Sequence, residues 1–504
     1  MSDTQHHVVR REFLDISVAG TEGDGLAAQR RIAGLCRDWL GPALDEVLAR
    51  VVPPDEHWTF DRLEVDVGAF GLDTLERDFV RTVTDAIERQ IRDRAGGRGG
   101  GISQRAPVGT TESVGAADRV LRRSGAEAVL DAFHYFLATG ALPWWYRLPP
   151  DTTLEAALTL SWPSDAMPAA FAASVQHAIV ATRARTRAMR QLSPAFLMRL
   201  LHRIAPDIAT VAAAAWSITE SEKLSGPRTQ AVFEALWQAA FAAADGLSLA
   251  AAWRDFAPSP QGEGERALAL RIANLLSSSS MGAVSTDDGS LQPHADASRG
   301  EGARLDGAVR QTRGKSNEAE RTFRRTKRSE TRPHERIDLD EGVFVESAGV
   351  VLLHPFLPRL FEGLGIAAGG KLAAPDRALA MLHFLATGER RAPEHALVLG
   401  KRLCGLPLEE PCGAPHPVSD AEAEEGNGLL AAVIGHWAAL GGASTDALRG
   451  SFLVRRGKLG LRGDDEVLQV EEHAFDVLLD QLPWGLSPVR LPWMDKMLWV
   501  EWRM

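Results

Sequence analysis

Residues 133–145 read FHYFLATGALPWW, and this stretch contains the two patterns that recur along the chain. Its first half is an apolar run that stops at Thr139-Gly140, where a glycine just past the last helical residue ends a helix. Leu-Pro-Trp follows, and proline cannot continue a helix. The stretch therefore predicts short helices ended by glycine or proline, each with a bulky indole placed just beyond the helix end.

Both patterns return in the second half of the chain. Phe-Leu-Ala-Thr-Gly is repeated at 384–388, and Gly388 is again expected to end an apolar helix. Leu-Pro-Trp is repeated at 482–484 and 491–493. The middle and C-terminal parts of the chain could be divergent copies of one helical unit. Chance similarity of five common residues is the alternative.

The Leu-Pro-Trp motifs have three interpretations. In the first, proline ends a helix and tryptophan folds back as a core plug whose indole N–H finds one acceptor. In 475–485, Phe475, Leu478, Leu479 and Leu482 would form the apolar face behind that plug. In the second, tryptophan is an exposed hot spot for a partner protein. A ligand site is the third. The candidate structural or partner-binding residues are Trp144, Trp145, Trp484, Trp493, Trp499 and Trp502.

Periodicity and composition predict an α+β fold that is predominantly helical. Residues 1–94 are expected to form a small α/β unit of strand, helix, strand and helix, followed by a glycine-rich linker at 95–115. A helical module spans 116–256. Residues 257–336 are expected to be a disordered polar linker, with twelve Lys/Arg against six Asp/Glu over 299–336. Residues 337–504 form a C-terminal helical module with a hairpin.

Local patterns place individual elements within these modules. Strand-like alternation occurs at 11–18 and 62–68, and helical spacing of apolar residues covers 26–51 and 73–91. Near the C-terminus, 457–472 reads as a β-hairpin with RGDD at its turn. The final residues alternate as in a strand through Leu498, Val500 and Trp502.

Composition limits the class of protein. The net charge of −11 argues against nucleic acid as the main partner. Cys36, Cys404 and Cys412 are too few for a disulfide framework and fit a reducing compartment. The first residues lack an apolar signal region, and no apolar run reaches about 18 residues. The sequence therefore predicts a cytoplasmic chain without a membrane partner.

Motifs for catalysis and metal binding are absent from the sequence. Cys404, Cys412 and His416 do not have zinc-ligand spacing, so Cys404 is expected to be a buried apolar cysteine. Glu394-His395 follows a proline and is expected to start a helix, where the negative charge of Glu394 interacts favourably with the helix dipole. His354 is expected to be a core histidine. No cofactor, metal or catalytic residue is predicted.

Several stretches together resemble one family. The C-terminal runs at 348–366, 377–389, 393–408, 429–459 and 470–494, the middle run at 133–145 and the N-terminal run at 62–80 are similar to the contractile injection system tape measure proteins. This resemblance implies a bacterial, phage-tail-like injection machine and a role in setting the length of its tube and sheath. It implies no catalysis and no cofactor.

Three hypotheses about function follow. The first is a structural protein that measures tube length and enters the particle. All 504 residues as one helix would span roughly 750 Å, but 27 prolines and 46 glycines break every candidate rod. That composition favours the second, a cytoplasmic assembly factor or chaperone that binds tube, cap or baseplate components. Self-association is left open. The third is an assembly-associated hydrolase.

Overall fold

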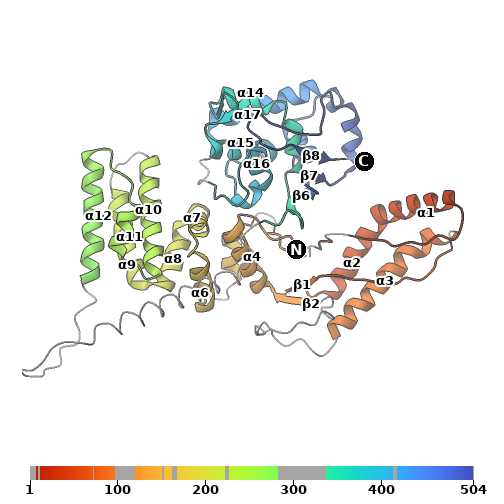
Figure 1. The fold of residues 1–504 in the computed structure, drawn as a ribbon, viewed down its shortest axis with the longest axis horizontal. Coiled ribbons are helices and arrows are strands. Elements are labelled where there is room, and N and C mark those ends of the chain that lie inside the picture. Colours follow the sequence, from red (N-terminus) through yellow and green to blue (C-terminus); the bar gives the residue numbers. More distant parts are fainter. Residues whose placement is uncertain are drawn as a thin grey trace, which may run out of the picture. The chain divides into compact units, whose positions relative to one another are not determined.

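The computed structural model describes residues 7–9, 12–71, 73–96, 120–149, 152–161, 167–221, 226–281, 337–412 and 417–502. The chain divides into two compact units. Unit 1 comprises Met1–Phe133 and Pro143–Asp165, and unit 2 comprises His134–Leu142 and Ala166–Met504. The fold is predominantly helical with small sheets, as the sequence predicts (Figure 1).

Unit 1 is a set of packed helices with one two-stranded sheet. Its elements are α1 (Glu22–Leu35), η1 (Cys36–Leu40), α2 (Gly41–Val51), β1 (Glu56–Phe60), α3 (Leu75–Gly96), β2 (Val120–Ser124) and α5 (Leu154–Leu160), with the first part of α4 (Gly125–Thr139). A capping box starts α1, because the Asp24 N–H donates to the Thr21 hydroxyl and the Thr21 N–H donates to the Asp24 carboxylate. The core between α1 and α3 consists of Ile32, Leu35, Leu40, Leu75, Phe79 and Val83.

The two strands predicted at 11–18 and 62–68 are wrong. Residues 12–18 and 62–68 have no regular structure, and the sheet is formed by β1 and β2, paired antiparallel. Alternation describes a two-faced segment, but a strand also needs a hydrogen-bonding neighbour. For the second segment that neighbour is a helix: Gln90 and Arg94 of α3 donate side-chain N–H groups to the carbonyls of Glu64 and Arg62, at 2.7 and 2.8 Å.

The first part of unit 2 is helical. Its helices are the end of α4, α6 (Ala169–Ala178), α7 (Thr182–Gln191), α8 (Pro194–Ile204), α9 (Pro206–Ser221), α10 (Gly226–Ala244), α11 (Leu249–Phe256) and α12 (Glu263–Met281). Proline and serine mark the helix starts, as at α8, where the Ser193 hydroxyl accepts from the Phe196 N–H and Pro194 is the first helical residue. Small alanines let α9 and α10 pack closely around Ala215, Ala235 and Ala239.

Helix α12 corrects the start of the predicted second linker. Residues 257–336 are expected to be a disordered linker, but 263–281 form a helix. Leu268, Ile272 and Leu276 recur every fourth residue and are buried against the neighbouring helices. Residues 282–336, and residues 97–115 of the glycine-rich linker, lie outside the described residues.

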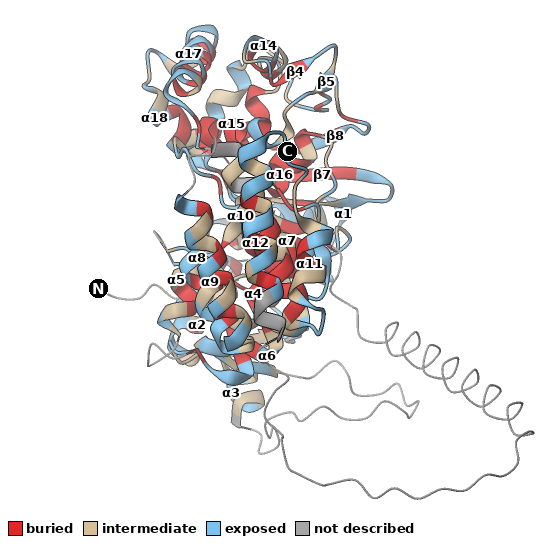
Figure 2. Ribbon diagram, turned by 90° about the vertical axis from the view of Figure 1, so that its left-hand side faces the viewer, coloured by how far each residue is buried: buried red, intermediate tan, exposed pale blue. Residues whose placement is uncertain are grey.

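The second part of unit 2 combines short helices with a four-stranded sheet. Its elements are β3 (Val343–Val345), η3 (Ala348–Leu353), α14 (Leu357–Gly363), β4 (Ala367–Ala368), β5 (Lys371–Leu372), α15 (Pro375–Thr387), η4 (Glu394–Leu397), α16 (Val398–Leu403), α17 (Asp420–His436), η5 (Ala438–Leu440), α18 (Thr445–Leu448), η6 (Arg449–Leu453), β6 (Gly457–Arg462), β7 (Asp465–Val470), η7 (Ala474–Gln481) and β8 (Leu498–Glu501). Nine consecutive residues of α15, 378–386, are buried, and the helix is largely red in Figure 2. It is the central helix of this part of the unit.

The sheet has the strand order β3-β6-β7-β8. β6 and β7 form the predicted hairpin, and Gly463 at its turn has φ +62°, a conformation that glycine adopts without strain. β8 is the predicted C-terminal strand and pairs parallel to β7, with Val467 beside Trp499. The connection from β7 to β8 carries two Leu-Pro-Trp motifs, so it brings Trp484 and Trp493 back over the helices.

No helix in the described part of the chain is long and apolar enough to span a membrane.

Candidate functional site

The tryptophans of the first Leu-Pro-Trp motif belong to unit 1. Trp144 and Trp145 are both half-buried. The guanidinium of Arg123 on β2 lies 4.4 Å from the centre of the Trp145 ring, a cation–π contact. Tyr146 packs edge-on against the same ring at 6.1 Å. The Trp145 ring is therefore held between a strand and its own loop.

The tryptophans of the other two motifs pack on the core of unit 2. The indole N–H of Trp484 donates to the Leu352 carbonyl at 3.1 Å, and that of Trp493 donates to the Leu403 carbonyl at 2.8 Å. Trp493 stacks on Phe361 with ring centres 5.4 Å apart. Both rings are half-buried and in contact with the core. Each indole thus ties the long β7–β8 connection to a helix that is distant in sequence.

Trp502 lies in a buried polar cluster at the end of β8. Its indole N–H donates to the Asp476 carboxylate at 3.0 Å, and Arg455 forms an ion pair with the same carboxylate at 2.9 Å. The Arg455 and Asp476 side chains are 1% and 2% exposed. Of the apolar face predicted for 475–485, Leu478, Leu479 and Leu482 pack against the core, but Phe475 is 58% exposed and Asp476 is buried in its place.

Trp499 is the exposed member of the six candidate tryptophans. It lies on β8 between the buried Leu498 and Val500, and alternation along the strand turns its ring to the outer face, where it is 42% exposed. Met497, two residues before Trp499, is 45% exposed. On the same strand face, Glu501 accepts from Gln469 at 3.1 Å and pairs with Arg462. An aromatic ring beside polar and charged groups is typical of a protein-binding surface.

A buried ionic junction, formed by Arg187, Glu394 and Lys401, lies in the interior of unit 2. One carboxylate oxygen of Glu394 contacts Arg187 Nε at 3.0 Å and Lys401 Nζ at 2.7 Å. The Arg187, Glu394 and Lys401 side chains are 0%, 0% and 1% exposed. Further N–H groups of Arg187 donate to the carbonyls of Leu137 and Glu409. The junction links α4, α7 and η4.

Sequence reasoning misses the ionic junction. Glu394 does begin η4 after Pro393, as the prediction of a helix start requires. Its carboxylate, however, is buried beside Arg187, which is 207 positions away in the chain. The available signal is weak: Arg187 lies among five other arginines of 183–203 and near the buried Ala184 and Ala188 on the same helix. Spacing alone does not distinguish it from a solvated arginine.

The thiols and histidines near the ionic junction lack the features of reactive groups. Cys404 and Cys412 are buried, and burial raises the pKa of the Cys412 thiol to about 12 although Lys401 lies beside it. The Cys404 pKa is raised by the same cause. Burial lowers the pKa of His395 to about 4, so this imidazole is neutral at pH 7. No group of three metal-ligating side chains occurs in the described residues.

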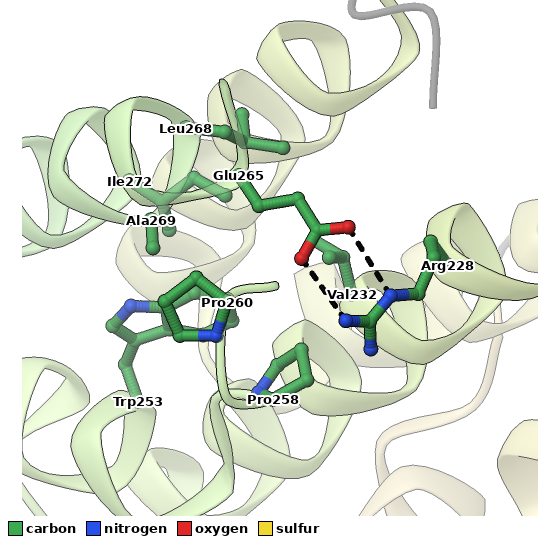
Figure 3. Close-up of a pocket in the computed structure, with 9 residues that line it drawn as sticks. All are labelled: Arg228, Val232, Trp253, Pro258, Pro260, Glu265, Leu268, Ala269 and Ile272. Carbon is green, nitrogen blue, oxygen red and sulfur yellow. Dashed lines mark hydrogen bonds and ion pairs between the residues drawn. The ribbon is translucent and has the colours of Figure 1, made fainter. Parts of the chain in front are cut away.

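A small pocket lies between α10, α11 and α12 (Figure 3). Trp253, Pro258, Pro260 and Ile272 contribute apolar walls. A bidentate ion pair joins Arg228 and Glu265 at 3.1 Å beside them. The free volume is about 20 Å³, room for one water molecule. The pocket is therefore too small for a substrate or cofactor.

Comparison with known proteins identifies a family. A family model described as contractile injection system tape measure protein matches residues 6–502. No curated protein and no solved structure matches the chain. The match extends across both units, and so includes the candidate tryptophans and the ionic junction.

Proposed function

The chain belongs to the contractile injection system tape measure family, whose role is structural, and we propose that it acts as a folded, partner-binding protein during assembly of the injection apparatus. Its proposed partners are the tube, cap or baseplate components, met in the cytoplasm. The observation that carries this proposal is the compactness of the described parts. The longest described helix, α3, has 22 residues, about 33 Å at about 1.5 Å per residue.

The proposed contact surface is the β8 patch, defined here as Met497, Trp499 and Glu501. Tryptophan dominates the binding energy of many interfaces because it removes a large rigid surface from water. Trp499 is the candidate whose ring is exposed while its strand neighbours are buried. A ring on a strand of the central sheet is also held rigidly, which lowers the entropy lost on binding.

The test is co-purification of apparatus components with tagged chain from cells that express the whole injection system. Trp499→Ala is expected to lower recovery of its partner by about tenfold, which corresponds to about 1.4 kcal/mol. Leu247→Ala is the matched control, because Leu247 is an apolar side chain that is 56% exposed on the turn before α11. Equal recovery with wild type and both variants would remove the β8 patch from the proposal.

Length measurement is the second candidate function, and the family description favours it. A ruler converts residues into tube length, whereas an assembly factor does not. Duplication of 282–336, which lies outside the described residues, separates the two. A change of particle length in electron micrographs, together with the chain in purified particles, supports the ruler. Particles of unchanged length support the assembly factor.

An assembly-associated hydrolase is the third hypothesis. It predicts that one buried carboxylate or histidine can be substituted with folding intact and assembly lost. His383→Gln and His354→Gln are suitable, because His383 is buried and His354 is half-buried. Normal particle yield with both variants argues against this hypothesis for these two residues.

A further inference from the structure

Helices α4 and α15 end in the same way. Gly140 and Gly388 both have φ +82°, and the N–H of each donates to the motif phenylalanine carbonyl at 2.7 Å. Before each glycine, the hydroxyl of Thr139 or Thr387 donates to the carbonyl four residues earlier, at 2.7 and 2.8 Å. The repeated Phe-Leu-Ala-Thr-Gly sequence is therefore also a repeated structure.

An arginine from a later helix completes each of these helix ends. Arg187 donates to the carbonyl of Leu137, and Arg449 donates to the carbonyl of Leu385 at 3.3 Å. The two leucines occupy the same position of the motif. A shared motif, a shared glycine conformation and a shared arginine donor together indicate two copies of one helical unit.

The carboxylate partner of the arginine differs between the copies. In the first copy it is Glu394, which enters from η4 of the second copy and stands beside Arg187, in the space where a Cβ on Gly140 would be. In the second copy it is Asp446, from one turn before Arg449, at 3.0 Å. The Asp446 side chain is 88% exposed, whereas Glu394 is fully buried.

At the second helix end, the space beside the glycine is not filled by a carboxylate. The nearest atoms around the Cβ position of Gly388 belong to Arg449 and are 3.6 Å away. A guanidinium has five N–H donors, and those of Arg449 bond to Leu385, Asp446 and, at 2.9 Å, Asn427. Among the described contacts, two of the five Arg449 N–H groups are not used, and they are left for a further acceptor. The Arg449 side chain is 10% exposed.

We propose that the Arg449 socket, defined as Gly388, Asn427, Asp446 and Arg449, binds a carboxylate side chain of a partner protein. The partner presents this carboxylate at the start of a short helix after a proline, as Pro393 and Glu394 do in the first copy. The proposal rests on the proposed function, since the partner is another component of the apparatus. The partner's carboxylate replaces Asp446, whose side chain is 88% exposed, at the guanidinium.

The probe is a fluorescent peptide with the sequence of residues 389–403, ERRAPEHALVLGKRL, added to the full chain. Two near-isosteric substitutions change the socket in opposite directions. Asp446→Asn removes the competing carboxylate and is expected to tighten binding by about fivefold. Asn427→Asp supplies a second carboxylate to Arg449 and is expected to weaken binding by a similar factor.

A peptide with glutamine in place of Glu394 is the control ligand, and it should bind all three proteins weakly and equally. Equal affinity of the glutamate peptide for wild type, Asp446→Asn and Asn427→Asp would overturn the proposal, and so would no binding to Asp446→Asn. Thermal unfolding of both variants verifies that the socket is folded. Arg449 itself is left unchanged because it caps α15.

The proposed function fails independently of the socket. If the peptide binds as expected but deletion of the whole chain leaves particle assembly intact, the socket stands and the assembly role falls. If deletion abolishes assembly while the peptide affinities stay equal, the assembly role stands and the socket falls.

Discussion

At the scale of single residues, the Glu394 carboxylate is the counter-charge of two buried cations. Glu394→Gln keeps the shape of the side chain but leaves Arg187 and Lys401 buried without a counter-charge. Removing one partner of a buried ion pair costs about 3–5 kcal/mol. The free energy of unfolding, measured by urea titration, is expected to fall by that amount. Glu424→Gln, an exposed position on α17, should change it by less than about 0.5 kcal/mol.

Trp484 and Trp499 offer a matched pair of large-to-small substitutions. Trp484 contacts Phe356 edge-on at 5.1 Å and donates to the Leu352 carbonyl. Trp484→Ala is expected to cost about 3 kcal/mol, at the low end for tryptophan because the ring is half-buried. Trp499→Ala should leave the melting temperature nearly unchanged, since 42% of the residue is already exposed. Equal losses of stability would show that Trp499 is part of the core.

His395 predicts a pH dependence of stability. Its folded pKa of about 4 is below the ordinary histidine value of 6.5 because burial disfavours the charged ring. As the pH falls from 6.5 to 4, the unfolded chain takes up a proton that the folded chain refuses, so the free energy of unfolding decreases. His383 and His354 have lowered pKa values and act in the same direction. His395→Gln should reduce the stability difference between pH 7 and pH 5, measured by urea unfolding. An unchanged difference would contradict the assignment.

At the scale of secondary structure, the ends of helices carry the most information about stability. Gly388→Ala forces a side chain into φ +82° and is expected to cost about 1–2 kcal/mol. Gly140→Ala should cost more, because Glu394 and Arg187 stand where the new Cβ would be. Gly428→Ala is the control of opposite sign, since nothing lies near this exposed position within α17. It should stabilise by about 0.5–1 kcal/mol. Thermal unfolding measures all three.

Element prediction from sequence succeeds where the determinant is local. A glycine after an apolar helix, or Gly463 between two alternating segments, acts through its own backbone conformation, so helix ends and the hairpin follow from a few neighbouring residues. Strand pairing is not local. Residues 12–18 and 62–68 have a strand pattern, but the paired strand is Glu56–Phe60, whose partner begins at Val120. The ionic junction is missed for the same reason.

At the scale of the whole molecule, unit 2 does not divide at the module boundary proposed from sequence. Ala141 belongs to the core of the C-terminal part, and Arg187 and Gln191 bond to Glu394. A fragment of residues 337–504 is therefore expected to be less stable than these residues are in the full chain. The measurement is hydrogen exchange of the α15 amides, which should be faster in the fragment. Identical protection in the fragment and the full chain would support the sequence-based boundary.

The distance between Arg187 and Glu394 along the chain has a consequence for synthesis. The two residues are 207 positions apart. A ribosome adds about 5–20 residues per second, so roughly 10–40 s pass before the emerging arginine meets its glutamate. During that interval the Arg187 guanidinium has no counter-charge, and the apolar surface around it stays exposed in the nascent chain. Translation speed over 188–394, and the chaperones that meet the chain there, therefore affect how much of it reaches the native state.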